Sequence, residues 1–204
     1  MRKFLLVSIL LIISNTSKAE YNFKNWSGLY AGIHKSTSNL SSYAINPTVE
    51  NDYAPNIDKD QSNYGFLIGY NFQIKNFLIG AEYIHQNEVG KQLNVIMEDG
   101  TELGSVVYEN MYEYKLKLGY VFNDFLINVK YGTGDLYPYW KEWDVSDPPT
   151  THDYETKSIG IDRKIYDNFL YGIDFNETTL DVSYSSYFEE IHLKSYNFRI
   201  CYIF

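Results

Sequence analysis

The sequence predicts an all-β protein: an eight-stranded antiparallel transmembrane up-and-down β-barrel with four longer extracellular loops. Three observations favour this fold class. An export signal opens the chain, apolar and polar residues alternate along eight segments, and short polar turns of one kind separate pairs of those segments. Aromatic residues make up 18% of the 204 residues, more than the core of one domain of this size encloses. Many of these rings are therefore expected to face something other than water.

The N-terminus has the three parts of a secretory signal peptide. Arg2 and Lys3 form a basic start, residues 4–13 form an apolar run, and small residues follow at a cleavage site. The apolar run is too short to cross a bilayer as a helix. A buried strand of a cytosolic domain would not explain these three parts in this order. We expect residues 1–19 to be the signal peptide and residues 20–204 to be one outer-membrane β-barrel domain.

The first four expected strands lie near residues 26–36, 63–74, 77–87 and 108–122. Each alternates with period two, as a strand with one apolar face does. In the first, Leu29, Ala31 and Ile33 share the apolar face. In the fourth, which shows the clearest alternation, large apolar residues alternate with charged residues such as Glu113 and Lys117. A short polar turn joins the second expected strand to the third.

The last four expected strands lie near residues 125–136, 155–166, 169–180 and 192–204. The turns before the fifth and the seventh contain Asn and Asp, which tolerate the positive φ of two-residue hairpin turns. Three short turns and the two termini at one end give an even number of strands. This arrangement is expected to place both termini in the periplasm and the longer connections outside the cell.

The direction of the apolar face distinguishes a membrane barrel from a soluble one. In a soluble sandwich or a lipocalin-like barrel, the aromatic face would form the core. Here the opposite face carries many glycines, which weaken a solvated strand but suit a narrow interior, and rings concentrate beside the turns as an interfacial girdle requires. We expect rings and aliphatic residues to face lipid and charges to face the lumen. A soluble lipocalin-like barrel is the alternative.

Several segments resemble a known family. Residues 25–32 resemble the Trp-Thr-Gly-aromatic-Tyr-x-Gly opening of the small porin-family or opacity-type surface proteins, and residues 114–122 and 125–134 resemble two strands of that family. The terminal residues, with Tyr202 and Phe204, look like the assembly signal that the outer-membrane insertion machinery reads. The resemblance implies an eight-stranded outer-membrane barrel whose members serve as surface antigens, adhesins or envelope tethers.

Charged residues on the inward faces nearly balance in number. They are Glu82, Glu113, Asp162 and Asp174 against Lys115, Lys117, Lys130, Lys164 and Arg199. Charges in a narrow lumen are paired or hydrated, because isolated buried ions are costly. An eight-stranded barrel is narrow enough to be filled by its own side chains. We therefore expect a structural ion-pair network in the lumen, with an ion path as the alternative.

The longer connections are acidic, in keeping with a formal net charge of −9. An anionic rim disfavours nucleic acid and other polyanions as partners. It could attract basic host proteins or divalent cations near lipopolysaccharide, or it could simply be solvated. One segment is rich in rings and is a candidate loop contact with a host surface, the alternative being the outer aromatic girdle. Its rings are Tyr137, Tyr139, Trp140 and Trp143.

No motif indicates catalysis, a metal site or a cofactor. The four histidines are scattered without metal-ligand spacing, and haem binding near His85 is a remote alternative. His192 and Ser195 are three apart on a strand and point to opposite faces, so they do not form the pair of a lipid A deacylase. We expect a non-enzymatic, monomeric protein that contacts membrane lipid and lipopolysaccharide and acts as a surface antigen, adhesin or envelope structural protein. A small solute channel is the alternative.

Overall fold

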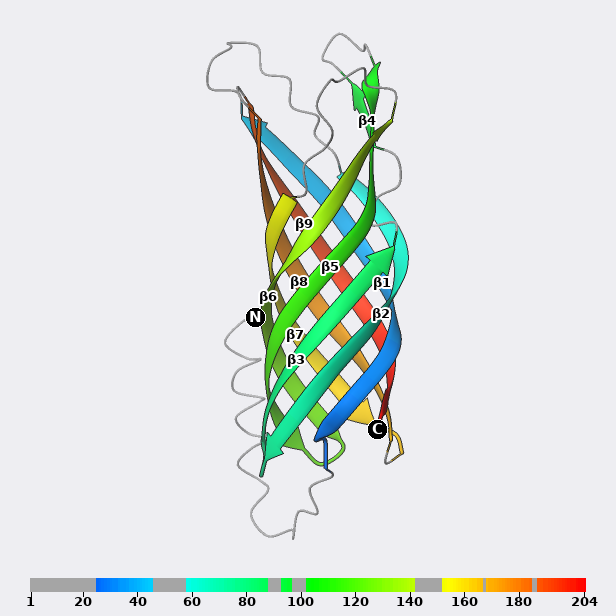
Figure 1. The fold of residues 1–204 in the computed structure, drawn as a ribbon, viewed down its shortest axis with the longest axis vertical. Coiled ribbons are helices and arrows are strands. Elements are labelled where there is room, and N and C mark those ends of the chain that lie inside the picture. Colours follow the sequence, from blue (N-terminus) through cyan, green and yellow to red (C-terminus); the bar gives the residue numbers. More distant parts are fainter. Residues whose placement is uncertain are drawn as a thin grey trace, which may run out of the picture.

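The structure is a computed structural model that describes residues 25–45, 58–87, 93–96, 102–141, 152–166, 168–184 and 187–204. Its strands wind round a single closed barrel, with the short turns at the lower end in Figure 1 and the longer connections at the upper end. In these ranges, no helix is long and apolar enough to cross a membrane.

Eight long strands form the barrel wall, and a ninth strand is short. The strands are β1 (Gly28–Ile45), β2 (Asp58–Ile74), β3 (Phe77–Asn87), β4 (Leu93–Ile96), β5 (Glu102–Phe122), β6 (Phe125–Lys141), β7 (His152–Lys164), β8 (Phe169–Tyr184) and β9 (Tyr187–Ile203). The order β3-β2-β1-β9-β8-β7-β6-β5 is antiparallel throughout, and pairing of β3 with β5 closes the barrel. β4 pairs with the first part of β5, outside the closed wall. The predicted eight-stranded antiparallel barrel is confirmed.

The strands extend farther toward the longer connections than their alternation predicted. β5 begins at Glu102, and β6 continues to Lys141. The fourth longer loop, predicted over residues 181–191, is instead a hairpin in which β8 and β9 stay paired up to Tyr184 and Tyr187. The prediction ended these strands too early because the apolar alternation stops while the backbone ladder continues.

Two of the three predicted short turns are two-residue hairpins. Lys75 and Asn123, the first residues of these turns, have φ values of 55° and 54°. Asn tolerates this left-handed conformation readily, and hairpin turns that follow the strand twist require it. The third connection, between β7 and β8, spans residues 165–168 and is longer.

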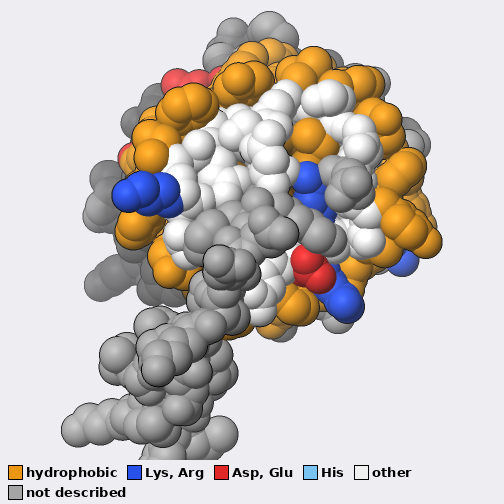
Figure 2. Space-filling view, turned by 90° about the horizontal axis from the view of Figure 1, so that it is seen from below, with side chains coloured by type: hydrophobic (Ala, Val, Ile, Leu, Met, Phe, Trp, Pro, Cys, Tyr) orange, Lys and Arg blue, Asp and Glu red, His pale blue; other side chains and the backbone are white. Residues whose placement is uncertain are grey.

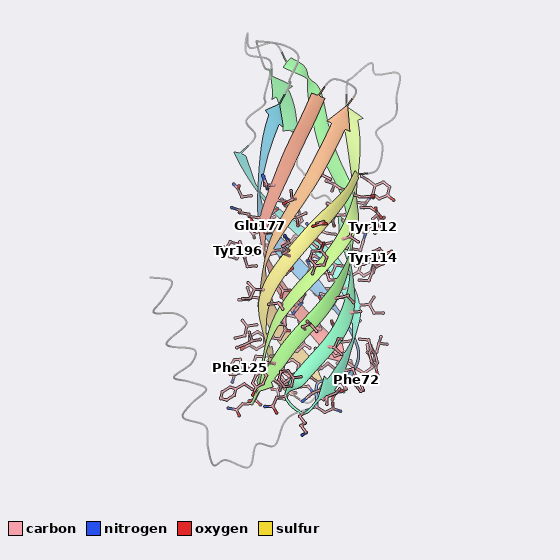
Figure 3. All side chains as sticks on the ribbon, turned by 90° about the vertical axis from the view of Figure 1, so that its left-hand side faces the viewer. Phe72, Tyr112, Tyr114, Phe125, Glu177 and Tyr196 are labelled. Atoms are coloured by element: carbon pink, nitrogen blue, oxygen red, sulfur yellow. The ribbon has the colours of Figure 1, made fainter. Side chains whose placement is uncertain are left out.

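Apolar side chains point out of the barrel and charged side chains point into it. Leu116 and Leu118 are 68% and 58% exposed, whereas the intervening Lys117 is 2% exposed. Figure 2 shows hydrophobic side chains around the rim of the barrel, and Figure 3 shows labelled rings such as Tyr114 and Phe125 pointing away from the ribbon. This polarity is the reverse of a soluble barrel and fits lipid around the wall.

The outward apolar surface forms a belt with a sharp upper boundary. From the short turns up to this boundary, every outward-facing residue is apolar except Arg163. The first polar outward residues of the eight strands are Lys35, Ser62, His85, Asn110, Thr133, Lys157, Glu177 and Lys194. We call the surface below them the apolar belt. A band of this kind around a closed barrel matches the hydrocarbon layer of a membrane.

Candidate functional site

The lumen contains a layer of side chains to which each strand of the wall contributes one residue. We call this group the ion layer. It comprises Tyr30 (β1), Asn71 (β2), Glu82 (β3), Lys117 (β5), Lys130 (β6), Asp162 (β7), Asp174 (β8) and Arg199 (β9). All eight residues are buried, so the layer ties the wall together across its interior.

Glu82 is the acceptor at which several members of the ion layer meet. Its Oε1 lies 2.5 Å from Lys117 Nζ and its Oε2 lies 2.7 Å from Lys130 Nζ. The Tyr30 hydroxyl donates to Glu82 Oε1 at 2.6 Å and accepts from Lys117 Nζ at 2.6 Å. Lys117 Nζ also donates to Asn71 Oδ1 at 3.3 Å. These contacts join four wall strands, β1, β2, β3 and β5, and reach β6 through Lys130.

Arg199 joins the two aspartates on the other side of the ion layer. Its Nη2 donates to both carboxylate oxygens of Asp162 at 2.7 Å, and its Nε donates to Asp162 Oδ1 at 2.9 Å. Its Nη1 lies 2.7 Å from Asp174 Oδ2, which also accepts from Lys130 Nζ at 2.9 Å. Guanidinium binds carboxylate in this forked geometry with high directional specificity. Three carboxylates therefore face three cations, and each buried charge has a partner of opposite sign.

An apolar cluster fills the lumen next to the short turns. Its buried members include Trp26, Leu78, Val121, Leu126, Leu170, Cys201 and Ile203. Trp26 is 0% exposed, and its backbone N–H donates to Gln73 Oε1 at 2.7 Å. Lys164 Nζ donates to the Asn25 carbonyl and lies 5.9 Å from the centre of the Trp26 ring. The residues that precede β1 thus seal the short-turn end with a buried indole.

Above the ion layer, the lumen is lined mainly by hydroxyl and amide side chains. Ser158 Oγ donates to Asn176 Oδ1 at 2.6 Å, and Thr178 Oγ1 donates to Thr156 Oγ1 at 3.1 Å. His34 Nδ1 is one of the buried polar atoms here that have no hydrogen-bond partner among the described residues. Buried polar groups of this kind are commonly satisfied by internal water. Within the described ranges, no group of three or more His, Cys, Asp or Glu side chains could hold a metal ion.

The structure brings together six of the nine charged residues that were predicted to share the lumen. Glu113 and Lys115 form a separate buried pair at 2.8 Å, and Lys164 binds the Asn25 carbonyl instead. Sequence reasoning missed Tyr30 and Asn71. The available signal was a large ring at position 30 on a face that otherwise carries small and polar residues.

The predicted ring-rich loop contact is only partly in a loop. Tyr137 lies in β6, is 43% exposed, and packs edge-on against Tyr112 with ring centres 5.5 Å apart. Tyr139 and Trp140 also belong to β6, where they pair with residues 107 and 106 of β5. Their assignment to a loop is therefore corrected. Trp143 lies outside the described residues.

The predicted assembly-signal rings, Tyr202 and Phe204, both lie on the outer surface. Their ring centres are 5.1 Å apart, and Phe169 on β8 lies 5.1 Å from Tyr202. Asn168 Nδ2 donates to the Tyr202 hydroxyl at 3.3 Å. His85, considered above for haem, lies between Phe66 and Tyr112 with ring centres 5.0 and 4.7 Å away.

The geometry of this barrel recurs in solved structures. Neisserial surface protein A matches with a TM-score of 0.53 at 8% identity, over 87% of this chain and 98% of that chain. OprG from Pseudomonas aeruginosa matches with a TM-score of 0.56 at 10% identity, over 87% of this chain and 96% of that chain. The chain has the fold of a small outer-membrane β-barrel. No family model and no curated protein sequence matches the sequence of this chain. The likeness to these solved structures is therefore a likeness of fold.

Proposed function

We propose that the protein is a non-enzymatic, monomeric integral protein of the outer membrane that acts at the cell surface as an antigen, adhesin or envelope structural protein. Residues 1–19 direct its export as a signal peptide. Both termini and the short turns face the periplasm, and the longer connections face outward. The position of the apolar belt next to the short turns supports this orientation.

The ion layer is the observation that carries this proposal. Because every wall strand contributes a buried residue to it, the lumen is crossed by side chains at that level. Its carboxylates are each held by cations, such as Glu82 by Lys117 and Lys130, which leaves none free to act as a general base. Because the interior is closed and its carboxylates are paired with cations, we expect partners to bind at the outer surface and the longer connections.

Lipid, lipopolysaccharide and the insertion machinery are the proposed partners at the wall. Lys35 and Lys194 stand just above the apolar belt, where phosphate groups of lipopolysaccharide would lie. Tyr202 and Phe204 present outward rings at the end of the last strand, as a docking signal for the insertion machinery would. The acidic chain, with a net charge of −9, argues against nucleic acid.

The adhesin role is tested by replacing Trp140 and Trp143 with Ser. Loss of binding of cells to a host surface, with unchanged heat-modifiable migration of the folded barrel, supports a contact patch. Impaired membrane insertion supports a girdle role for these rings instead. Tyr196→Ser is the matched control, because Tyr196 is an outward ring of the apolar belt, 62% exposed, on a distant strand.

A small solute channel is the second candidate function. The polar upper lumen favours it, because Ser38 Oγ and Asn197 Oδ1 are buried there without a hydrogen-bond partner among the described residues, and buried polar atoms of this kind bind internal water. Recording current across a planar bilayer that contains the refolded protein separates the two functions. The closed ion layer predicts no discrete conductance, and steady single-channel steps would favour the channel.

A further inference from the structure

An apolar groove of about 610 Å³ lies on the outer wall near the short turns of β2, β3, β5 and β6. The floor of the groove is formed by Leu78, Gly119 and Asn128 on β3, β5 and β6. Leu78 pairs with Gly119, and Gly119 pairs with Asn128. Aromatic and aliphatic side chains stand along its sides. They include Phe72, Ile74, Phe77, Ile79, Tyr120 and Ile127. The groove lies within the apolar belt.

The end of this groove nearest the turns is held in a fixed shape. The rings of Phe77 and Tyr120 pack edge-on with centres 5.4 Å apart. Asn76 Nδ2 donates to the Tyr120 hydroxyl at 3.2 Å, and Val121 N donates to the Asn76 carbonyl at 2.6 Å. The β2–β3 turn therefore orders the rings that border the groove.

The β2–β3 turn beside this end of the groove carries an exposed lysine. Lys75 follows the groove residue Ile74 directly at the tip of the turn and is exposed. Its carbonyl accepts from Gln73 Nε2, but its ammonium group has no hydrogen bond or ion pair with any residue that the structure describes. Arg163, the outward cation of the belt, is by contrast hydrogen-bonded to the Tyr171 hydroxyl at 3.4 Å.

We propose that this groove binds a phospholipid with an anionic head group, one acyl chain lying along the groove and the head-group phosphate at Lys75. The inference rests on the proposed function, which places this end of the barrel at the periplasmic leaflet. An apolar groove with an exposed lysine in the turn next to its lining residue Ile74 complements an amphiphile with a negative head group. A lysine at the membrane surface attracts anionic lipid by an amount that corresponds to about fivefold in affinity.

Native mass spectrometry of the folded, delipidated protein tests this site. The probes are dioleoyl phosphatidylglycerol and dioleoylglycerol, which has the same chains without a phosphate. Lys75→Gln is expected to weaken phosphatidylglycerol binding about fivefold and to leave dioleoylglycerol binding unchanged. Ile79→Trp, which fills the groove, is expected to abolish binding of both. Ile161→Trp and Lys157→Gln are matched controls elsewhere on the outer wall and are expected to bind like the parent.

Equal lipid binding by Ile79→Trp and Ile161→Trp would overturn the proposal. The proposal would also be overturned if the parent formed a dimer that Ile79→Trp dissociates, because the groove would then be a dimer interface. Heat-modifiable migration of each variant reports folding independently of lipid binding. Loss of the lipid site leaves the outer-membrane assignment standing, whereas failure of the parent chain to insert into lipid vesicles would count against the proposed function itself.

Discussion

Asp174 lies over Gly160, its partner on the neighbouring strand. A Cβ atom at Gly160 would stand 1.9 Å from Asp174 Oδ1, so any other residue at position 160 would push this carboxylate from the place where Arg199 and Lys130 hold it. Two residues along, the order is reversed: Asp162 on β7 lies over Gly172 on β8, where a Cβ would stand 1.8 Å from Asp162 Oδ1. This exchange lets aspartates from adjacent strands both reach Arg199.

Gly160→Ala is therefore expected to destabilise the barrel by about 1–3 kcal/mol, because the new methyl group displaces Asp174 from its cations. Urea unfolding in lipid vesicles measures the change. Gly119→Ala is the matched control: its Cβ would meet chiefly the Leu126 Cδ1 methyl at 2.5 Å, the end of a side chain that can rotate. Equal losses in the two variants would show that the carboxylate is not what requires glycine at position 160.

Arg199→Gln is expected to cost about 3–5 kcal/mol, since it leaves Asp162 without a cation in a buried site. The comparison variant is Lys194→Gln, which removes an exposed cation 3.9 Å from Glu177 and is expected to cost less than about 1 kcal/mol. Both are read from the urea midpoint of the folded species. If the two variants unfold alike, the ion layer does not stabilise the barrel in the way inferred above.

Trp26→Ala is expected to lower the free energy of unfolding by about 3–5 kcal/mol, because it removes the buried indole and leaves a cavity in the apolar cluster at the short-turn end. It is nevertheless expected to give no conductance in a planar bilayer, since the ion layer above the indole still crosses the lumen. Discrete current steps in this variant would show that the tryptophan, and not the ion layer, closes the barrel. Phe125→Ala, which trims an outward ring, serves as the control.

Stability is expected to depend on pH through Asp135 on β6, whose partner across the ladder above the apolar belt is Asp153 on β7. Partial burial of Asp135, together with the hydrogen bond and negative charge of Asp153, raises the pKa of Asp135. The folded state then holds a proton that the unfolded state releases near pH 4, so stability falls as pH rises above about 4. Asp135→Asn is expected to be more stable than the parent at pH 7 and equal to it at pH 3. Melting temperatures are measured for parent and variant at both pH values. The same difference in melting temperature at pH 3 and at pH 7 would contradict this expectation.

The sequence was sufficient to predict the eight wall strands because lipid outside and charge inside give the strongest period-two contrast. It failed at the upper ends of the strands, where outward residues such as Thr133 and Lys157 are as polar as inward ones. It also could not decide which inward residues meet. That depends on the stagger of the closed sheet, which brings Tyr30 to Glu82 across the lumen and leaves Glu113 to pair with its near neighbour Lys115.

The reversed polarity of the wall is the central claim, and spin labelling tests it most directly. Single cysteines at Leu118, Ile161 and Phe198, in a Cys201→Ser background, carry a nitroxide on the refolded protein in lipid vesicles. We predict that relaxation of all three labels is enhanced by oxygen, which dissolves in the hydrocarbon, and hardly at all by a water-soluble nickel chelate. Labels that respond to the nickel chelate and not to oxygen would contradict the account, because the apolar belt would then not face lipid.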